Sequence, residues 1–398
     1  MKNSKEISLF ENTQVAFESK SDKQLRKANL LFSIINRPFL SKAGTLAAKA
    51  ALAINLPIKG IIKNTVFEHF CGGESIEESA STIEELAKFG IETILDYSVE
   101  GEESEEALDH TREEILKIIA AAKNSPHIPF SVFKMSGLAS NELLTKIGAG
   151  KELNQEEELR YQKVVERVDT LCKTAFENDV PILIDAEETW IQDPIDHLVY
   201  VMMEKYNKEK AIVYNTYQMY RYNALDLLKN GFERAEKGGY FFGAKLVRGA
   251  YMEKERERAE DQGYRDPIHK TKKDTDECYD AGLKFCVEKI SKTSLISGSH
   301  NELSNYYLTE LIAENNLQVN DPRIWFAQLY GMSDTISFNL SNRGYNVVKY
   351  VPYGPVKSVM PYLIRRAEEN TSVAGQSSRE LTLIRKEIRR RKNGNDKG

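Results

Sequence analysis

Two closely spaced cations stand out in the segment YFFGAKLVRGAYMEKERERA, residues 240–259. Lys245 lies inside an apolar run typical of a buried strand, where an unpaired ammonium group would be costly. We therefore expect Lys245 to have a buried anionic or polar partner. Arg248 and the small pair Gly249 and Ala250 come next, and these small residues would let a ligand approach the backbone closely. The alternative is an ordinary strand end with both cations in water.

Three carboxylates, Asp185, Glu187 and Glu188, end a second apolar run in the segment ILIDAEETW, residues 182–190. Carboxylates this close repel one another unless cations or hydrogen bonds hold them. They could cap the next helix, bind a metal ion or act in acid–base chemistry. The chain has six histidines and no HxH or HExxH spacing. A metal site is therefore the weaker interpretation, and we expect none.

Two adjacent arginines, Arg365 and Arg366, occur in the segment YLIRRAEEN, residues 362–370. Neighbouring side chains on a helix point about 100° apart, so both can reach one ligand only if it lies over the helix start. A bidentate arginine is the usual holder of a carboxylate. A solvated helix face is the more common environment of such an arginine pair. Here the preceding YVPYGP loop and Tyr362 favour a pocket.

These residues lie among apolar runs that alternate with helical patterns along the chain. Alternation of this kind predicts parallel strands joined by helical crossovers, and eight such units close a (β/α)8 barrel. An open doubly wound sheet is the alternative, but no GxGxxG follows the first strand and no GxxxxGK is present. The predicted strands are residues 93–99, 128–134, 180–185, 211–217, 243–247, 294–299, 323–329 and 347–351. The clearest helical patterns are residues 157–177, 220–237, 275–290, 302–314 and 356–370.

In a barrel of this type, functional side chains come from the C-terminal ends of the strands. For His300, a packed imidazole is the most common interpretation, with a base or a ligand as the alternatives. Tyr251, Tyr350 and Tyr362 stand out because they flank the cationic motifs. The predicted strand ends deliver Asp96, Glu100, Lys134, Asp185, Glu187, Glu188, Asn215, Gln218, Lys245, Arg248, Ser299, His300, Asn301, Gln328 and Tyr350.

The composition allows one large domain with an appendage, since 41% of the 398 residues are hydrophobic and 29% are charged. We expect an N-terminal helical arm at residues 1–86, the barrel at residues 87–375 and a basic tail at residues 376–398. The formal net charge of −5 argues against a nucleic-acid partner.

Four scattered cysteines without a CxxC pair suit a reducing compartment, and the N-terminus lacks the features of a signal or transit peptide. We therefore expect a cytoplasmic protein. The apolar stretch at residues 44–62 is interrupted by Lys49, Pro57 and Lys59, so it falls short of the roughly 20 apolar residues of a membrane span. The basic tail is typical of a solvated end; the second interpretation is peripheral contact with anionic lipid at the cytoplasmic membrane.

The motifs DAEETW, NTYQ, KLVRGAY, SHN, QLYGM, YVPYGP and YLIRRAEEN follow one another in the order and spacing of the proline dehydrogenase family, which the chain resembles over roughly residues 93–372. The resemblance implies a (β/α)8 barrel with non-covalent FAD across the strand ends. It also implies oxidation of L-proline to pyrroline-5-carboxylate and transfer of the electrons to a quinone. We expect a monofunctional enzyme whose product is oxidised by a separate pyrroline-5-carboxylate dehydrogenase.

The resemblance also assigns roles by position within the motifs. Glu187 would support the polar shell, and Glu100, next to Asp96, would pair with an arginine to gate the site. Lys245 and Asn215 depart from the Arg and Gln of long bifunctional members, although shorter relatives match them. The expected substrate-binding residues are Lys134, Arg365 and Arg366 for the carboxylate and Tyr251, Tyr350, Tyr362, Leu246, Leu329 and Asp185 for the walls, with Asp185 and Lys245 also catalytic. The expected cofactor-binding residues are Asn215, Lys245, Val247, Arg248, Gly249, Ala250, Ser299, His300, Asn301 and Glu369.

Three other functions stay open. Oxidation of 4-hydroxyproline on the same scaffold is the nearest, although Tyr350 should crowd an added hydroxyl group. A metal-dependent or Schiff-base lyase could use the Asp185 cluster or a lysine on the same barrel. A non-catalytic binding protein that keeps the pocket is the least favoured, because every matched position carries a chemically competent residue.

Overall fold

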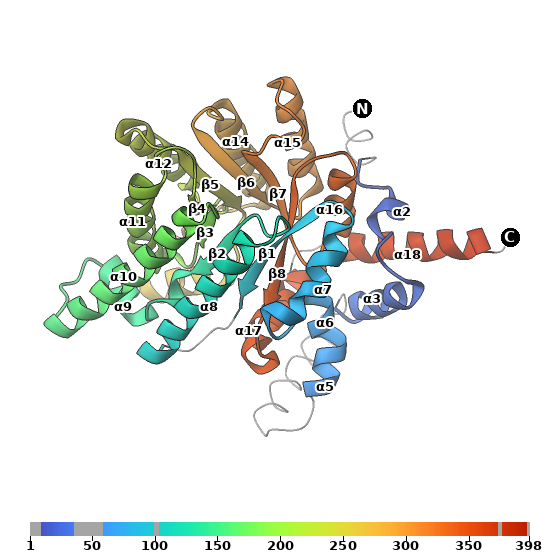
Figure 1. Ribbon diagram of the computed structural model, residues 1–398, viewed down its shortest axis with the longest axis horizontal. Coiled ribbons are helices and arrows are strands. Elements are labelled where there is room, and N and C mark those ends of the chain that lie inside the picture. The colour runs from blue at the N-terminus through green and yellow to red at the C-terminus, as the bar shows by residue number, and fades with distance from the viewer. Residues whose placement is uncertain (1–8, 36–58, 99–102, 373–375, 396–398) are drawn as a thin grey trace. The chain divides into compact units, whose positions relative to one another are not determined.

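The computed structural model describes residues 9–35, 59–98, 103–372 and 376–395, and eight parallel strands in it form a nearly closed barrel with helices between them (Figure 1). The sheet order is β1-β8-β7-β6-β5-β4-β3-β2, and a bridge between Ile94 and Phe130 joins the first strand to the segment before the second. All eight predicted strands are confirmed. They are β1 (Ile91–Tyr97), β2 (Ser131–Lys134), β3 (Ile182–Asp185), β4 (Val213–Gln218), β5 (Phe242–Val247), β6 (Thr293–Gly298), β7 (Ile324–Leu329) and β8 (Val347–Tyr353).

The chain divides into two compact units. Unit 1 comprises Met1–Glu92, Ser98–Glu100 and Gln328–Gly398, and unit 2 comprises Thr93–Tyr97 and Gly101–Ala327. The division therefore passes through β1 and β7. The predicted boundaries at residues 86 and 375 stay a prediction.

Unit 2 contains the middle strands and the helices that connect them. Local signals set the helix ends: Asn154 and Glu157 form a reciprocal capping box at the start of α10, and Gly239, with φ +66°, ends α12 in the left-handed conformation. The helices of unit 2 are α8 (Glu105–Lys123), η2 (Met135–Gly137), α9 (Asn141–Gly148), α10 (Gln155–Glu177), α11 (Thr189–Tyr206), α12 (Ala224–Gly238), α13 (Met252–Gln262), α14 (Lys272–Glu288) and α15 (Glu302–Glu314).

Aromatic contacts show which sides of β4 and β7 face the barrel interior. The Phe130 ring makes edge contacts with Tyr214 of β4 and Trp325 of β7, at centroid distances of 6.0 and 5.3 Å. Rings from well-separated strands can meet in this way only inside the barrel. Because side chains alternate along a strand, Thr216 shares the interior side with Tyr214, whereas Asn215 faces the helices.

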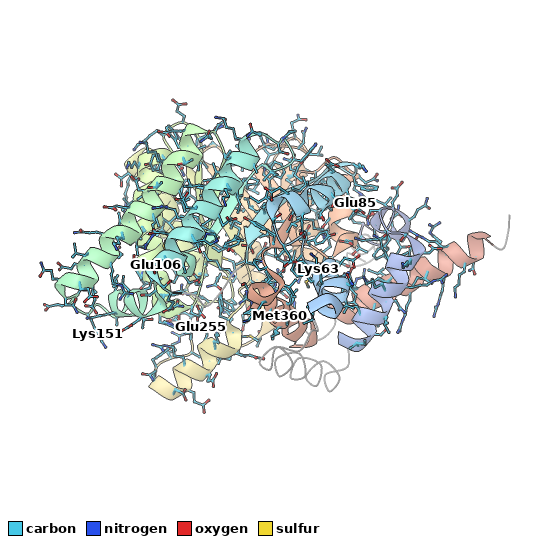
Figure 2. The ribbon with its side chains drawn as sticks, turned by 60° about the horizontal axis from the view of Figure 1, so that its bottom comes forward. Lys63, Glu85, Glu106, Lys151, Glu255 and Met360 are labelled. Atoms are coloured by element: carbon cyan, nitrogen blue, oxygen red, sulfur yellow. The ribbon has the colours of Figure 1, made fainter. Side chains whose placement is uncertain are left out.

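Unit 1 brings the N-terminal helices together with the C-terminal ones. Glu74, which follows Gly72 and Gly73, accepts a hydrogen bond from Val356 N at the start of α17, and Lys63 forms an ion pair with Glu74 at 2.7 Å. Figure 2 labels Lys63 and also Met360 of α17, which packs in a buried apolar cluster with Phe67. The helices of unit 1 are α2 (Thr13–Ala16), α3 (Asp22–Ile35), α5 (Lys59–Ile62), η1 (Lys63–Phe67), α6 (Glu68–Phe70), α7 (Ile76–Ala87), α16 (Asp334–Ser341), α17 (Val356–Ser372) and α18 (Gln376–Asn395).

The basic C-terminal segment is not simply a solvated end. It forms α18, which packs against α3 (Figure 1) through a buried cluster that includes Phe32 and Ile384. Arg391 donates to Lys20 O at 2.8 Å and pairs with Glu387, which is fully buried. The expectation failed because apolar residues at helical spacing give this basic helix a buried face.

The interrupted apolar stretch is only partly visible. Residues 44–58 of it lie outside the described residues, and the described remainder is the single turn α5. Across the four described ranges, no helix combines the length and apolar character needed to cross a membrane.

Candidate active site

The interior of unit 2 carries three charged side chains at the C-terminal ends of neighbouring strands. Lys134 of β2 lies in register beside Asp185 of β3, and Thr216 of β4 lies beside Lys245 of β5. Asp185 and Lys245 form an ion pair across β4, with side-chain exposures of 18% and 5%. The expected buried partner of Lys245 is therefore confirmed as Asp185, and this pair faces the barrel interior with Lys134.

The other carboxylates of the DAEETW segment are held apart by their own partners. Glu187 accepts hydrogen bonds from Ser136 N at 2.8 Å and from Ser136 Oγ. Burial raises the pKa of Glu187 to about 7, although the Ser136 hydrogen bonds and Lys134 act in the opposite direction. Glu188 pairs with Lys254 at 3.0 Å and makes no capping hydrogen bond to α11, which it precedes. The segment thus supplies one buried carboxyl group that titrates near neutral pH.

Small residues follow Lys245 on the interior side of the next strands. Val247, Gly298 and Ala327 occupy one register row on β5, β6 and β7. A Cβ atom at Gly298 would lie 3.0 Å from Val247 Cγ1, so even alanine would be tight there. Lys245 precedes Val247 by two residues and shares its face of β5, so a flat ligand that carries or gains negative charge over this row would lie near a cation.

A protein side chain approaches the backbone closely at Gly249, and the ligand approach expected at the Gly249–Ala250 pair stays a prediction. Gly249 has φ +131°, and a Cβ atom there would lie 2.5 Å from the Tyr220 ring. Only glycine fits this position without strain. Tyr251, which follows, is buried. The backbone of this loop is therefore fixed against the segment after β4.

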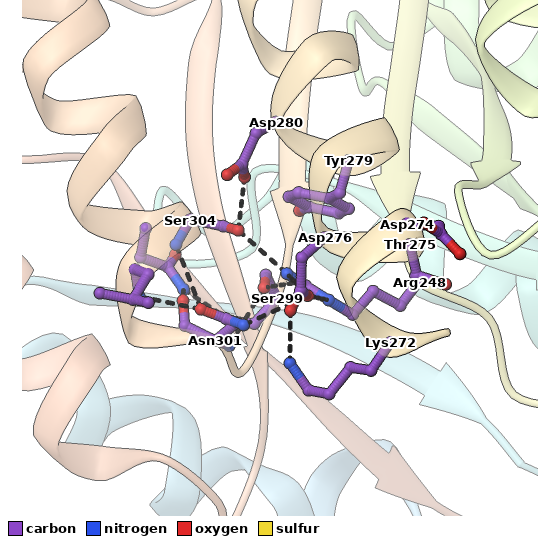
Figure 3. Close-up of polar contacts among 12 residues, drawn as sticks. Arg248, Lys272, Asp274, Thr275, Asp276, Tyr279, Asp280, Ser299, Asn301 and Ser304 are labelled. Atoms are coloured by element: carbon purple, nitrogen blue, oxygen red, sulfur yellow. Dashed lines mark hydrogen bonds and ion pairs between the residues drawn. The ribbon is translucent and has the colours of Figure 1, made fainter. Parts of the chain in front are cut away.

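Arg248 lies in a polar cluster between β5, α14 and α15 (Figure 3). Its guanidinium group donates to Asp276 Oδ1 at 2.8 Å, Ser299 Oγ at 2.7 Å and Ser304 Oγ at 2.9 Å. Asn301 caps α15 by accepting from Ser304 N at 3.2 Å. Three predicted cofactor-binding residues, Arg248, Ser299 and Asn301, therefore meet at the N-terminus of α15, an end that favours anions.

Two predicted site residues face the helix layer. The Asn215 side chain donates to Asp196 Oδ1 of α11 at 2.9 Å, and burial raises the pKa of Asp196 to about 6. Leu246 packs against Gly282 of α14, where an added Cβ atom would lie 3.1 Å from Leu246 Cδ1. The ligand contacts expected of Asn215 and Leu246 stay predictions.

The predicted carboxylate and wall residues near the C-terminus belong to unit 1. The Arg366 guanidinium group lies over the Tyr362 ring at 5.1 Å, and both residues are buried. Tyr350 is also buried, and its carbonyl accepts from Tyr330 N at 2.8 Å. Because Lys134 belongs to unit 2, the three-cation clamp of Lys134, Arg365 and Arg366 stays a prediction. The roles of Leu329 and His300 also stay predictions, and Glu100 and the Glu369 side chain lie outside the described residues.

Lys349 is a buried cation that was not among the predicted site residues. Lys349 of β8 is fully buried and pairs with Asp334 at 2.9 Å. The signal was the same as for Lys245, an ammonium group inside the apolar run VVKYV.

Comparisons with known proteins indicate which family the chain resembles. The family model described as proline dehydrogenase matches residues 79–379. Proline dehydrogenase 1, mitochondrial, of Dictyostelium discoideum is 35% identical over 96% of this chain and 74% of its own length. The hydroxyproline dehydrogenase of Xenopus laevis is 30% identical over 94% of this chain and 88% of its own length.

Solved structures show the same fold. Proline utilization A from Bdellovibrio bacteriovorus, inactivated by N-propargylglycine, superimposes with a TM-score of 0.73 at 20% identity and covers 93% of this chain. The present chain spans 41% of that protein's length. From the family match and the relatives together, we conclude that the chain belongs to the proline dehydrogenase family.

Proposed function

We propose that this protein oxidises L-proline to pyrroline-5-carboxylate, with non-covalent FAD as the hydride acceptor and a quinone as the final electron acceptor. The observation that carries the proposal is the buried Lys245–Asp185 pair beside Lys134 on the interior face of the strand ends in a member of this family. Bound FAD would supply the electron-accepting ring. A separate pyrroline-5-carboxylate dehydrogenase would use the product.

The residues present fit a flavin. Lys245 would stabilise negative charge that develops on the ring, and the small side chains of Gly298 and Ala327 would admit a flat group beside it. The cluster of Arg248 and Asn301 at the start of α15 offers donors suited to a phosphate group. These residues would hold the cofactor at its ring and at its phosphates.

Substrate orientation would come from the protein's cations. Lys134, Arg365 and Arg366 would bind the proline carboxylate and place the ring carbon next to nitrogen against the acceptor. Proline must lose its ammonium proton before the hydride leaves, because the nitrogen lone pair assists the transfer. The proton would pass to water or to a site acid, and Glu187 is a buried carboxyl group with a pKa of about 7. A pH profile of the reductive half-reaction tests this step.

Oxidation of 4-hydroxyproline is the second candidate, because a relative of similar length is a hydroxyproline dehydrogenase. Tyr350, a buried side chain on β8, favours L-proline because an added hydroxyl group would crowd it. The ratio of kcat/KM for L-proline to that for trans-4-hydroxy-L-proline separates the two substrates.

The deciding experiment uses purified protein under anaerobic conditions. We expect yellow protein whose flavin absorbance bleaches on addition of L-proline and returns on addition of a soluble quinone. Colourless protein, or flavin that stays oxidised with L-proline, would contradict the proposal. Flavin that bleaches only with 4-hydroxyproline would instead favour the second candidate.

We also propose a cytoplasmic protein that makes peripheral contact with anionic lipid through α3 and α18. Leu30 and Ile34 of α3 are 62% and 42% exposed, while the two acidic residues of α18, Glu380 and Glu387, are buried. A basic surface with exposed apolar side chains suits an anionic bilayer. The exposed cations of the two helices are Lys23, Arg26, Lys27, Arg385, Lys386, Arg389, Arg390 and Lys392.

Sedimentation with lipid vesicles tests this contact. We expect the protein to sediment with vesicles containing phosphatidylglycerol and to stay in the supernatant with phosphatidylcholine alone. A Leu30→Ser, Lys27→Ser double variant should bind less. Sedimentation of the variant with phosphatidylglycerol vesicles to the same extent as the wild-type protein would rule out this surface.

A further inference from the structure

The turn between β7 and α16 holds two residues in the left-handed conformation. Gly331 has φ +75° and Ser333 has φ +52°. A Cβ atom at Gly331 would lie 2.2 Å from the His69 carbonyl oxygen, so the turn is pressed against α6. A serine in this region is strained, and such a conformation persists only where the surroundings hold it.

Lys349 is the central support of this turn. Its fully buried ammonium group donates to Met332 O at 2.5 Å, Leu329 O at 3.4 Å and Asp334 Oδ1 at 2.9 Å. These acceptors come from before, within and after the strained residues. An ammonium group has three protons to donate, and the three acceptors take one each.

The N-terminal and C-terminal helices of unit 1 hold the same turn from outside. His69 Nε2 lies 2.9 Å from Gly331 O, and Ser333 N donates to Glu380 Oε2 of α18 at 3.2 Å. Burial lowers the pKa of His69 to about 4, so its ring is neutral and donates to this carbonyl from Nε2. The turn is therefore held by hydrogen bonds from β8, α6 and α18.

The turn is also directly connected to two predicted walls of the substrate pocket. Leu329, the last residue of β7, leads into the turn, and its carbonyl oxygen accepts a hydrogen bond from Lys349. Tyr330 N donates to Tyr350 O at 2.8 Å, and Tyr350 follows Lys349 in β8. Neighbouring residues of a strand point to opposite faces, so Lys349 fixes the backbone from the side away from Tyr350.

We infer that Lys349 is a positioning residue for the substrate pocket. Lys349 holds the turn at residues 329–333, so that Leu329 and Tyr350 keep the spacing that selects L-proline over 4-hydroxyproline. This inference rests on the proposed function. Lys349 itself does not touch the substrate. Its effect is on the binding and discrimination of the ring rather than on the hydride step.

The test is the double variant Lys349→Met, Asp334→Asn, which removes the carbonyl support without leaving an unpaired buried charge. We expect it to fold and hold flavin, with KM for L-proline raised by about 10-fold and kcat little changed, since a displaced wall mainly weakens ground-state binding. The preference for L-proline over trans-4-hydroxy-L-proline should fall. The dissociation constant of cyclopentanecarboxylate, which has the ring and carboxylate but no amine, should rise in parallel.

Two further variants keep the test decisive. Gly331→Ala moves the same turn through the His69 contact and leaves all charges in place, so it should raise KM in the same direction. Glu387→Gln removes a fully buried carboxylate that pairs with Arg391 within α18. It is the matched control and should lower stability without changing KM or preference. Wild-type KM and preference in either turn variant would overturn the inference. Absence of flavin reduction in the wild-type protein would instead refute the proposed function.

Discussion

Two buried lysine–aspartate pairs lie at strands in different units of this molecule, and they differ in what else they hold. In unit 1, Lys349 is fully buried and shares its protons between Asp334 and two backbone carbonyls. In unit 2, Lys245 pairs with Asp185, whose side chain is 18% exposed on the barrel interior. The first pair is tied to the main chain, whereas the second joins two side chains at a strand end.

This difference indicates how a buried charge can serve stability or chemistry. A lysine that donates to carbonyls fixes the path of the backbone, and its removal leaves several buried acceptors without a donor. A lysine paired with a partly exposed carboxylate at the barrel interior can stabilise negative charge on a ligand bound there. We therefore expect the two pairs to respond differently to the same substitution.

The largest expected effect is on the stability of unit 1. Lys349→Met should lower the free energy of unfolding by about 3 to 5 kcal/mol, because the buried Asp334 carboxylate would lose its hydrogen-bonded ammonium partner. Urea titration followed by circular dichroism measures this change. A decrease in the free energy of unfolding of less than about 1 kcal/mol, as expected at an exposed pair, would contradict the structural role of the Lys349–Asp334 pair.

The next effect is on the rate of the proposed reaction. Lys245→Met should slow flavin reduction by L-proline by about 100-fold, the scale typical of losing one preorganised electrostatic donor. Anaerobic stopped-flow absorbance measures this rate at saturating substrate. An unchanged rate would remove the chemical role of Lys245 and make the two pairs alike.

A third test uses the pH dependence of stability in unit 2. Burial raises the pKa of Glu187 to about 7 from 4.5, so the folded protein binds this proton more tightly than the unfolded chain. Its contribution to stability is therefore lost as pH rises from about 4.5 to 7. Glu187→Gln should stabilise the protein by about 1 to 3 kcal/mol at pH 8 and less at pH 5. Equal effects of the substitution at both pH values would show that the carboxyl group titrates normally.

The smallest effect calibrates the comparison. Lys205 and Asp169 are 2.7 Å apart, closer than Lys349 and Asp334, but their side chains are 53% and 32% exposed. Lys205→Ala should change the free energy of unfolding by less than about 1 kcal/mol, because water screens exposed pairs. The same urea titration measures it. A loss as large as that of Lys349→Met would show that distance, rather than burial, decides the result.

The sequence was sufficient to predict the eight strands and the pairing of Lys245. Apolar runs rich in β-branched residues mark buried parallel strands, and a lysine within such a run needs a partner. It did not show which side of β4 faces the interior, since both faces of a barrel strand are buried and no alternation of polar and apolar residues reveals them. For this reason the sequence did not reveal that the Asn215 side chain faces the helix layer, where it donates a hydrogen bond to Asp196.

Lys349 was missed for a different reason. Its run carries the same signal as that of Lys245, but two of its acceptors are backbone carbonyls of a turn at residues 329–333. Every residue has such a carbonyl, so residue types cannot identify the acceptors. The spacing of the apolar residues in α18 predicts a buried face. That face was missed because the segment was interpreted from its basic composition.

The pairing of the chain's two ends in unit 1 has a consequence for synthesis. Arg391 donates to Lys20 O, which lies 371 positions earlier. At ribosomal rates of about 5 to 20 residues per second, α3 must wait on the order of 20 to 70 seconds for this partner. Leu25 and Phe32, buried against α18 in the finished protein, would meanwhile stay uncovered on the nascent chain and be open to chaperones.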